Sequence, residues 1–182
     1  MFQRWLKKFT LFHLILIAIL AALGIGVKPV VSSLAHIITG PLLIPGGVVA
    51  GGVYMLFLVL AASLTGARGA AALCGLCQGL LVLAAGAAGS HGALSLITYT
   101  LPGLVAELAF LVFARRGATL PACCFGGMLA NVAGTVSVNF VFFSMPLIPL
   151  LLSLCAAALS GGLGGVAAWG ITKQLKRWDI VR

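Results

Sequence analysis

The side chain in this sequence with the clearest potential for chemistry is a glutamate inside an apolar segment. Tyr99, Gly103 and Glu107 follow one another at intervals of four residues, so on a helix they share one face. An aromatic ring, a gap and a carboxylate on one face predict a wall that binds a flat heteroaromatic or cationic ligand. The alternative is a carboxyl group that only hydrogen-bonds a neighbouring helix. A lone acid in a membrane needs one of these roles, because an unpaired charge there is costly.

A second group of polar residues forms a stripe on a later apolar segment. Asn131, Thr135 and Asn139 are also spaced by four residues, which places them along one side of a helix. Their amides and hydroxyl predict either hydrogen bonds between helices or the polar lining of a cavity that opens outward. Gln78 lies inside another apolar segment and is expected to reach the same interior.

Two histidines lie in segments expected outside the membrane. His36 and His91 are expected to cap one ligand site together with Tyr99, and the alternative is that both face water. There is no HExxH motif and neither histidine has a carboxylate near it in the sequence, which argues against a zinc site. The cysteines, including Cys74 and Cys77, are expected to behave as small apolar side chains. We therefore expect neither a metal nor a cofactor.

The composition requires these side chains to lie in a membrane. The chain has 182 residues, of which 62% are hydrophobic and 7% are charged, and its mean hydropathy is +1.24. So few charges cannot cover a surface that faces water. This excludes a conventional soluble enzyme, a secreted disulfide scaffold and a nucleic-acid-binding domain. The net charge of +9 then reflects membrane topology and not a nucleic-acid partner.

The length allows about six membrane crossings with short loops, because one span needs about 20 apolar residues. The apolar runs have suitable lengths, although the third is only marginally long enough. We expect a single all-α integral membrane domain over residues 1–182 with six transmembrane helices. These helices are expected over residues 11–27, 46–64, 70–85, 94–113, 120–143 and 147–172.

The basic residues predict the orientation of the chain. Ten of the eleven lie at the N-terminus, around Arg68, around Arg115 and at the C-terminus, whereas Lys28 lies alone on the other side. By the positive-inside rule both termini are cytoplasmic. The first run has no clear cleavage site, so we expect a retained span and not a signal peptide. The segment from Val30 to Pro45 carries polar residues and prolines, and we expect a long interfacial or re-entrant outer loop there.

Small residues at intervals of four predict close packing between helices. In the first run, Ala18, Ala22 and Gly26 have this spacing. That stripe either packs inside the bundle or docks another membrane subunit, and the spacing leaves both open. The last run carries two such stripes, Ser153, Ala157, Gly161 and Gly165 on one and Ser160, Gly164 and Ala168 on the other.

Together these features resemble the S component, the substrate-binding subunit, of an energy-coupling factor (ECF) vitamin transporter. The resemblance lies in the alanine pair of LIAILAALGIG, in GPLLIPGGVVAGG and in SHGALSLITYTLPGLVAELAF, and it extends over nearly the whole chain. It implies an outer substrate cavity formed by the first, third and fifth loops and the last three helices. It also implies that Ala18 and Ala22 dock the transmembrane T subunit, and that two separate ATPase subunits hydrolyse ATP.

The resemblance is greatest to S components for thiamine or its hydroxymethylpyrimidine precursor, whose rings suit Glu107 and Tyr99. It implies a non-enzymatic subunit in the plasma membrane of a prokaryote that captures a vitamin-like molecule from outside. Cobalamin, riboflavin and queuosine-type cargoes stay open. A stand-alone channel, scaffold or intramembrane enzyme is the remaining alternative, although only one span has a polar stripe and no second catalytic group lies beside Glu107.

Overall fold

The computed structural model describes residues 9–39, 45–85, 92–113 and 118–179. All regular elements in these ranges are helical. Besides the α-helices there is a short 3₁₀ turn, η2 (Gly92–Leu94), and a π-helical segment, η3 (Asn139–Phe143), that continues the helix before it. The α-helices are α2 (Leu11–Thr39), α3 (Gly46–Thr65), α4 (Ala70–Ala84), α5 (Ser95–Phe113), α6 (Leu120–Val138) and α7 (Leu147–Arg177).

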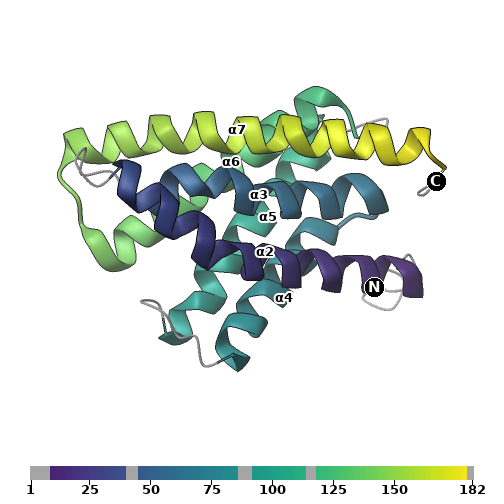
Figure 1. The fold of residues 1–182 in the computed structure, drawn as a ribbon, viewed down its shortest axis with the longest axis horizontal. Helices are drawn as coiled ribbons and strands as arrows, with labels where there is room; N and C mark the ends of the chain where they lie inside the picture. The colour runs from purple at the N-terminus through teal and green to yellow at the C-terminus, as the bar shows by residue number, and fades with distance from the viewer. Residues whose placement is uncertain (1–8, 40–44, 86–91, 114–117, 180–182) are drawn as a thin grey trace.

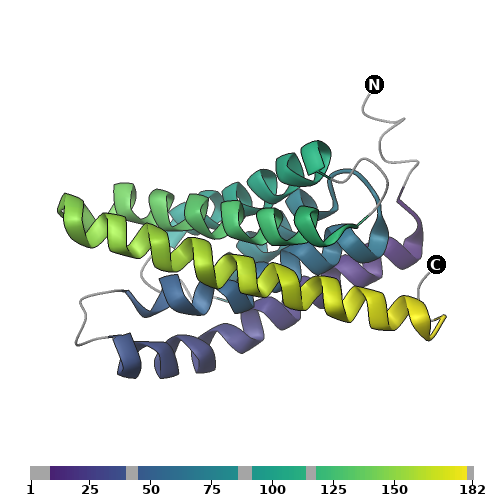
Figure 2. The same ribbon diagram turned by 90° about the horizontal axis from the view of Figure 1, so that it is seen from above.

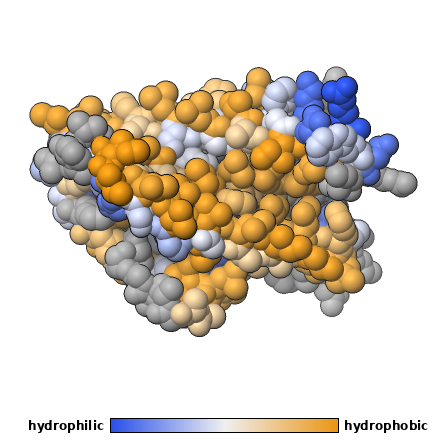
Figure 3. Space-filling view, in the orientation of Figure 1, coloured by the Kyte–Doolittle hydropathy of each residue, from blue (hydrophilic) through white to orange (hydrophobic). Residues whose placement is uncertain are grey.

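The helices have the lengths and composition of a membrane bundle. Within the described ranges, five are long and apolar enough to cross a bilayer, and α4 is a shorter apolar helix of 15 residues. Apolar side chains cover most of the face in Figure 3, and hydrophilic residues gather at the end where α7 finishes. Such a surface suits lipid and not water. The protein is therefore an integral membrane protein, and the crossing made by the short α4 stays a prediction.

The prediction of an outer loop from Val30 to Pro45 is wrong for residues 30–39, which are helical. The chain continues as one helix, α2, through Pro29 to Thr39, and residues 40–44 lie outside the described ranges. A proline inside a helix removes one backbone donor and favours a bend, and Figure 1 shows α2 bending along its length. The hydroxyls of the last turns bond within the helix: Ser33 Oγ donates to the Pro29 carbonyl at 2.8 Å, and Thr39 Oγ1 donates to the Ala35 carbonyl at 2.9 Å.

Helix α3 is the centre of the bundle. It packs against α2, α4, α5, α6 and α7, and it is the most buried of the long helices. Figures 1 and 2 show the beginning of α2 and the end of α7 at the same end of the molecule. Which side of the membrane that end faces stays a prediction from the basic residues.

The small residues of α7 bring backbones into direct contact, as their spacing predicts. A Cβ added to Gly161 would lie 2.3 Å from the carbonyl oxygen of Gly127 in α6, and one added to Gly164 would lie 2.0 Å from that of Gly52 in α3. The two stripes of α7 therefore pack against two different helices. The amide of Gly52 also donates to Ser160 Oγ at 2.9 Å. In lipid, where water exclusion does not drive helices together, such close packing holds the bundle.

Adding one methyl group at this contact tests the packing directly. Gly164→Ala should lower the thermal stability of the purified protein, because overpacking of this kind costs about 1–3 kcal/mol. Gly170→Ala, on the same helix, is the matched control, because an added Cβ there would meet nothing within 4 Å. Thermal unfolding in detergent, followed by tryptophan fluorescence, measures both variants. Equal midpoints for the two would contradict the backbone contact between α3 and α7.

Candidate functional site

A cavity of about 250 Å³ lies between α2, α3, α4, α5 and α6. Ligand pockets usually measure about 300–1,000 Å³, so this cavity suits a molecule with one or two rings. Its walls combine apolar side chains with several polar groups from different helices, which is the usual pattern of a small-molecule site. Its polar lining consists of Lys28, Ser32, His36, Tyr54, Gln78, Thr98, Tyr99, Asn131 and Thr135.

Helix α2 contributes a polar stripe of three residues. Lys28, Ser32 and His36 follow one another at intervals of four and all line the cavity. The stripe exists because the helix continues through Pro29, whereas a loop from residue 30 onward would not align these side chains. His36 lies at the exposed end of the stripe and packs beside the start of α3. A Cβ added to Gly46 would lie 2.7 Å from the backbone nitrogen of His36.

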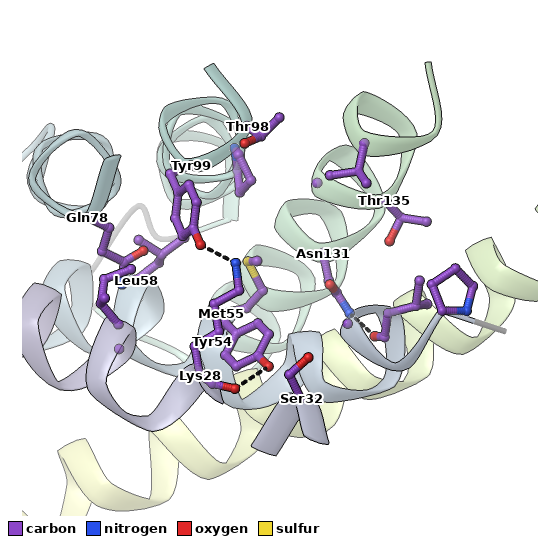
Figure 4. A pocket seen from close by; sticks show the side chains of 18 of the residues that line it. Lys28, Ser32, Tyr54, Met55, Leu58, Gln78, Thr98, Tyr99, Asn131 and Thr135 are labelled. Carbon is purple, nitrogen blue, oxygen red and sulfur yellow. Dashed lines mark hydrogen bonds between the residues drawn. The ribbon is translucent and has the colours of Figure 1, made fainter. Parts of the chain in front are cut away.

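A lysine and two tyrosines join three helices at the cavity wall. The Lys28 ammonium of α2 donates to the Tyr99 hydroxyl of α5, and it lies 4.4 Å from the centre of the Tyr99 ring. It lies 5.8 Å from the ring centre of Tyr54 in α3, whose hydroxyl donates to the Lys28 carbonyl at 3.2 Å. Figure 4 shows the lysine nitrogen turned toward the tyrosine hydroxyl. Cation–π attraction and the hydrogen bond to Tyr99 hold the ammonium in place without a carboxylate.

The polar stripe of α6 is divided between the cavity and the packing of the bundle. Asn131 is 3% exposed and lines the cavity, and its Nδ2 donates to the Val48 carbonyl at 3.1 Å and the Ala157 carbonyl at 2.9 Å. Its amide thus also joins α6 to α3 and α7. Thr135 is buried and lines the cavity. Asn139 is not part of the lining; its Oδ1 accepts a hydrogen bond from the Met145 amide at 2.9 Å.

Gln78 and Tyr99 both lie in the lining of the cavity. Gln78 is 4% exposed and comes from the short helix α4. It fills the space beside Gly24 of α2, where an added Cβ would meet Gln78 Nε2 at 2.4 Å. Whether either residue binds a substrate stays a prediction. His91 lies outside the described residues.

Glu107 lies away from the cavity. Its carboxylate accepts hydrogen bonds from the backbone amides of Gly69 and Ala71, the first at 2.5 Å and the second at 3.2 Å. These amides belong to the start of α4, where unpaired N–H groups and the positive end of the helix dipole favour a negative group. The lining of the cavity extends along α3 from its first turn to Leu58, whereas the partners of Glu107 come after the end of α3 at Thr65. These hydrogen bonds are of the kind that the structural alternative expects for Glu107, and whether Glu107 binds a substrate stays a prediction.

Lys28 and Ser32 line the cavity but are not among the site residues predicted from the sequence. In the sequence, Lys28 indicates only topology, and Ser32 lies in the predicted outer loop. The four-residue spacing of Lys28, Ser32 and His36 is the signal that could have found them. It was hidden because Pro29, which breaks most helices, stands at the start of the stripe.

The cavity has little to offer a metal ion. Within the part of the chain that the structure describes, no group of three His, Cys, Asp or Glu side chains could hold one. The five cysteines are free thiols, two of them fully buried. His36 is the one histidine in the described lining, and the neighbouring Lys28 ammonium repels a cation.

Comparison with known proteins gives a family and a fold. Residues 12–133, well over half of the chain, match the family described as "ABC-type cobalt transport system, permease component". No functionally curated protein matches the chain. A solved structure titled "Crystal structure of an S-component of ECF transporter" is similar, with a TM-score of 0.76 and 20% sequence identity, and the similarity covers 94% of this chain and 88% of that one. At that identity the likeness establishes the fold. The chain therefore belongs to the family of permease components of ABC-type cobalt transport systems, and it has the fold of an ECF S component.

Proposed function

We propose that the chain is the substrate-binding subunit of an ECF-type importer. It captures a small vitamin-like molecule outside the plasma membrane of a prokaryote and delivers it with the help of a T subunit and two ATPase subunits. The observation that carries the proposal is a cavity with polar groups from five helices inside a bundle with the fold of an S component. The chain itself is not an enzyme in this proposal.

The substrate would lie among Lys28, Tyr54, Gln78, Tyr99 and Asn131 in the interior of the cavity. The two tyrosine rings offer surfaces for stacking. The amide side chains and the ammonium offer hydrogen bonds that fix the orientation of the substrate. His36 and Thr135 extend this polar set. His91 lies outside the described residues and stays a predicted member of the site.

The resemblance predicts a cargo related to thiamine. Of the two candidates, we favour the hydroxymethylpyrimidine precursor over thiamine itself. The thiazolium cation of thiamine would lie beside the Lys28 ammonium, which repels it. Glu107, which is expected to attract such a cation, binds the start of α4. A single ring suits a cavity of about 250 Å³ better than the much larger cobalamin does. Riboflavin and queuosine-type molecules stay alternative cargoes.

The description of the family makes a cobalt ion the second candidate cargo. It would need several nitrogen, oxygen or sulfur ligands. Within the described lining only His36 is a strong ligand, and the charge of Lys28 opposes a divalent cation. We therefore favour an organic cargo.

The N-terminal half of α2 offers a docking face for the T subunit. Ala18, Ala22 and Gly26 are exposed to the outside of the bundle, whereas Ile17 and Ala21 on the other face are buried. A Cβ added to Gly26 would meet nothing within 4 Å. Small exposed residues at this spacing allow the backbone of a second helix to approach closely.

Larger side chains on this face should prevent assembly. Ala18→Leu and Ala22→Leu are expected to reduce co-purification with the T subunit and the ATPases at least tenfold while leaving the isolated chain folded. Ala167→Leu on the exposed face of α7 is the matched control and should assemble normally. Full assembly of both α2 variants would contradict the docking face. No co-purification of the wild-type chain would favour a stand-alone protein.

The molecule retained during purification identifies the cargo. We expect mass spectrometry of the extracted chain to find a small ring compound in amounts near one per protein, and elemental analysis to find no cobalt. The physical reason is the polar and aromatic lining around a single ammonium. Stoichiometric cobalt without an organic molecule would contradict this cargo class.

Glu107→Gln separates structural from substrate contacts. Hydrogen bonds to a charged group contribute about 1.5–3 kcal/mol, so the variant should melt at a lower temperature. The amount of retained molecule should not change, because Glu107 is not part of the lining. An unchanged melting temperature together with loss of the retained molecule would contradict this account and support a role for Glu107 in binding the substrate.

A further inference from the structure

The positive charge of Lys28 has no negative partner in its own chain. The whole sequence contains two acidic side chains, Glu107 and Asp179. Glu107 is bonded to the start of α4, and Asp179 follows the last turn of α7. Neither lines the cavity. Lys28 is thus an ammonium inside a membrane bundle that no carboxylate of the protein neutralises.

The groups around Lys28 are all neutral or positive. Tyr99 and Tyr54 supply a hydroxyl oxygen and two ring faces, which hold the ammonium but leave its charge uncompensated. Ser32 and His36 continue the stripe with further groups that can donate hydrogen bonds. A charge inside a membrane protein is normally paired or functional. The cavity therefore suits a ligand whose negative group pairs with Lys28.

The start of α3 adds to the same polarity. Pro45, Gly47 and Val48 line the cavity, so the first turn of a 20-residue helix faces it. Backbone N–H groups at a helix start favour a negative charge. A cationic cargo would be repelled both by this helix end and by the Lys28 ammonium. If the cargo displaced Lys28 from the tyrosines, no carboxylate of the protein would be near to pair with the ammonium.

We propose that the cargo of this subunit carries an anionic group, a phosphate or a carboxylate, and that the Lys28 ammonium binds it. This inference rests on the proposed function and specifies its substrate class. The ring of the cargo stacks on Tyr99 or Tyr54, and its anion takes the place of the tyrosine hydroxyl as the partner of Lys28. Lys28 is then the residue that distinguishes an anionic cargo from its neutral parent.

A matched pair of ligands tests the charge preference. Hydroxymethylpyrimidine and its monophosphate differ by the anionic group alone, and thiamine supplies the cation. Calorimetry on the full chain in phosphatidylcholine nanodiscs should give an affinity for the monophosphate about tenfold or more above that for the alcohol, because a charge-assisted hydrogen bond is worth at least that factor. Lys28→Gln should abolish the difference, and Lys28→Arg, which keeps the charge, should retain most of it. Thermal unfolding checks that both variants fold.

The remaining outcomes are decisive as well. Tighter binding of thiamine or of the neutral alcohol would overturn the anionic cargo and leave the importer subunit intact. No binding of the monophosphate at about 1 mM, or an unchanged preference in Lys28→Gln, would also overturn it. Loss of the preference in nanodiscs that contain phosphatidylglycerol would assign the anion to a lipid headgroup and not to a cargo. The importer subunit itself fails only if the chain does not assemble with the T subunit and ATPases.

Discussion

The contact of backbone against backbone between α3, α6 and α7 is the constraint on which the rest of the structure depends. Gly52 meets Gly164, and Gly127 meets Gly161, at distances that leave no room for a methyl group. Because lipid offers no hydrophobic driving force between helices, this packing must fix the bundle. It holds α6 against the core, so that Asn131 can bridge to both α3 and α7. These contacts fix the position of one wall of the cavity.

The opposite wall is built with charge and aromatic rings. Lys28 of α2 reaches Tyr99 of α5, and Tyr54 of α3 reaches the backbone of α2. The two acids of the chain lie outside this region, one of them as a cap on α4. The scarcity of acids thus has a consequence for binding: any negative charge in the cavity has to arrive with a ligand. Substrate capture and the positive charge of the site are parts of one arrangement.

Much of the fold could be predicted from the sequence because the apolar runs are long and their ends are marked by Gly, Pro or basic residues. Five of the six expected runs match α3 to α7 with small shifts at their ends. The small-residue stripes of α7 also pack as predicted, since four-residue spacing leaves few other arrangements. The first helix is longer than its predicted span, residues 11–27. Pro29 normally breaks a helix, but here α2 accommodates it and continues to Thr39.

The site was harder to predict, because burial depends on neighbours that the sequence does not specify. Gln78, Tyr99, Asn131 and Thr135 do line one cavity, whereas Glu107 shares a helix with Tyr99 and lies beyond the cavity. Spacing of four gives a common face but not a common depth. Lys28 was overlooked because one basic residue on the outer side fits the topology and needs no further reason.

The central claim is that a small molecule binds in the cavity between Lys28, Tyr99 and Asn131. The most direct measurement is an experimental structure of the chain with the molecule it retains during purification. We expect ligand density in this cavity, with a ligand atom within hydrogen-bond distance of Lys28 Nζ and a ring against Tyr99 or Tyr54. Density for the retained molecule at another place in the bundle, with the cavity closed by side chains, would contradict the account.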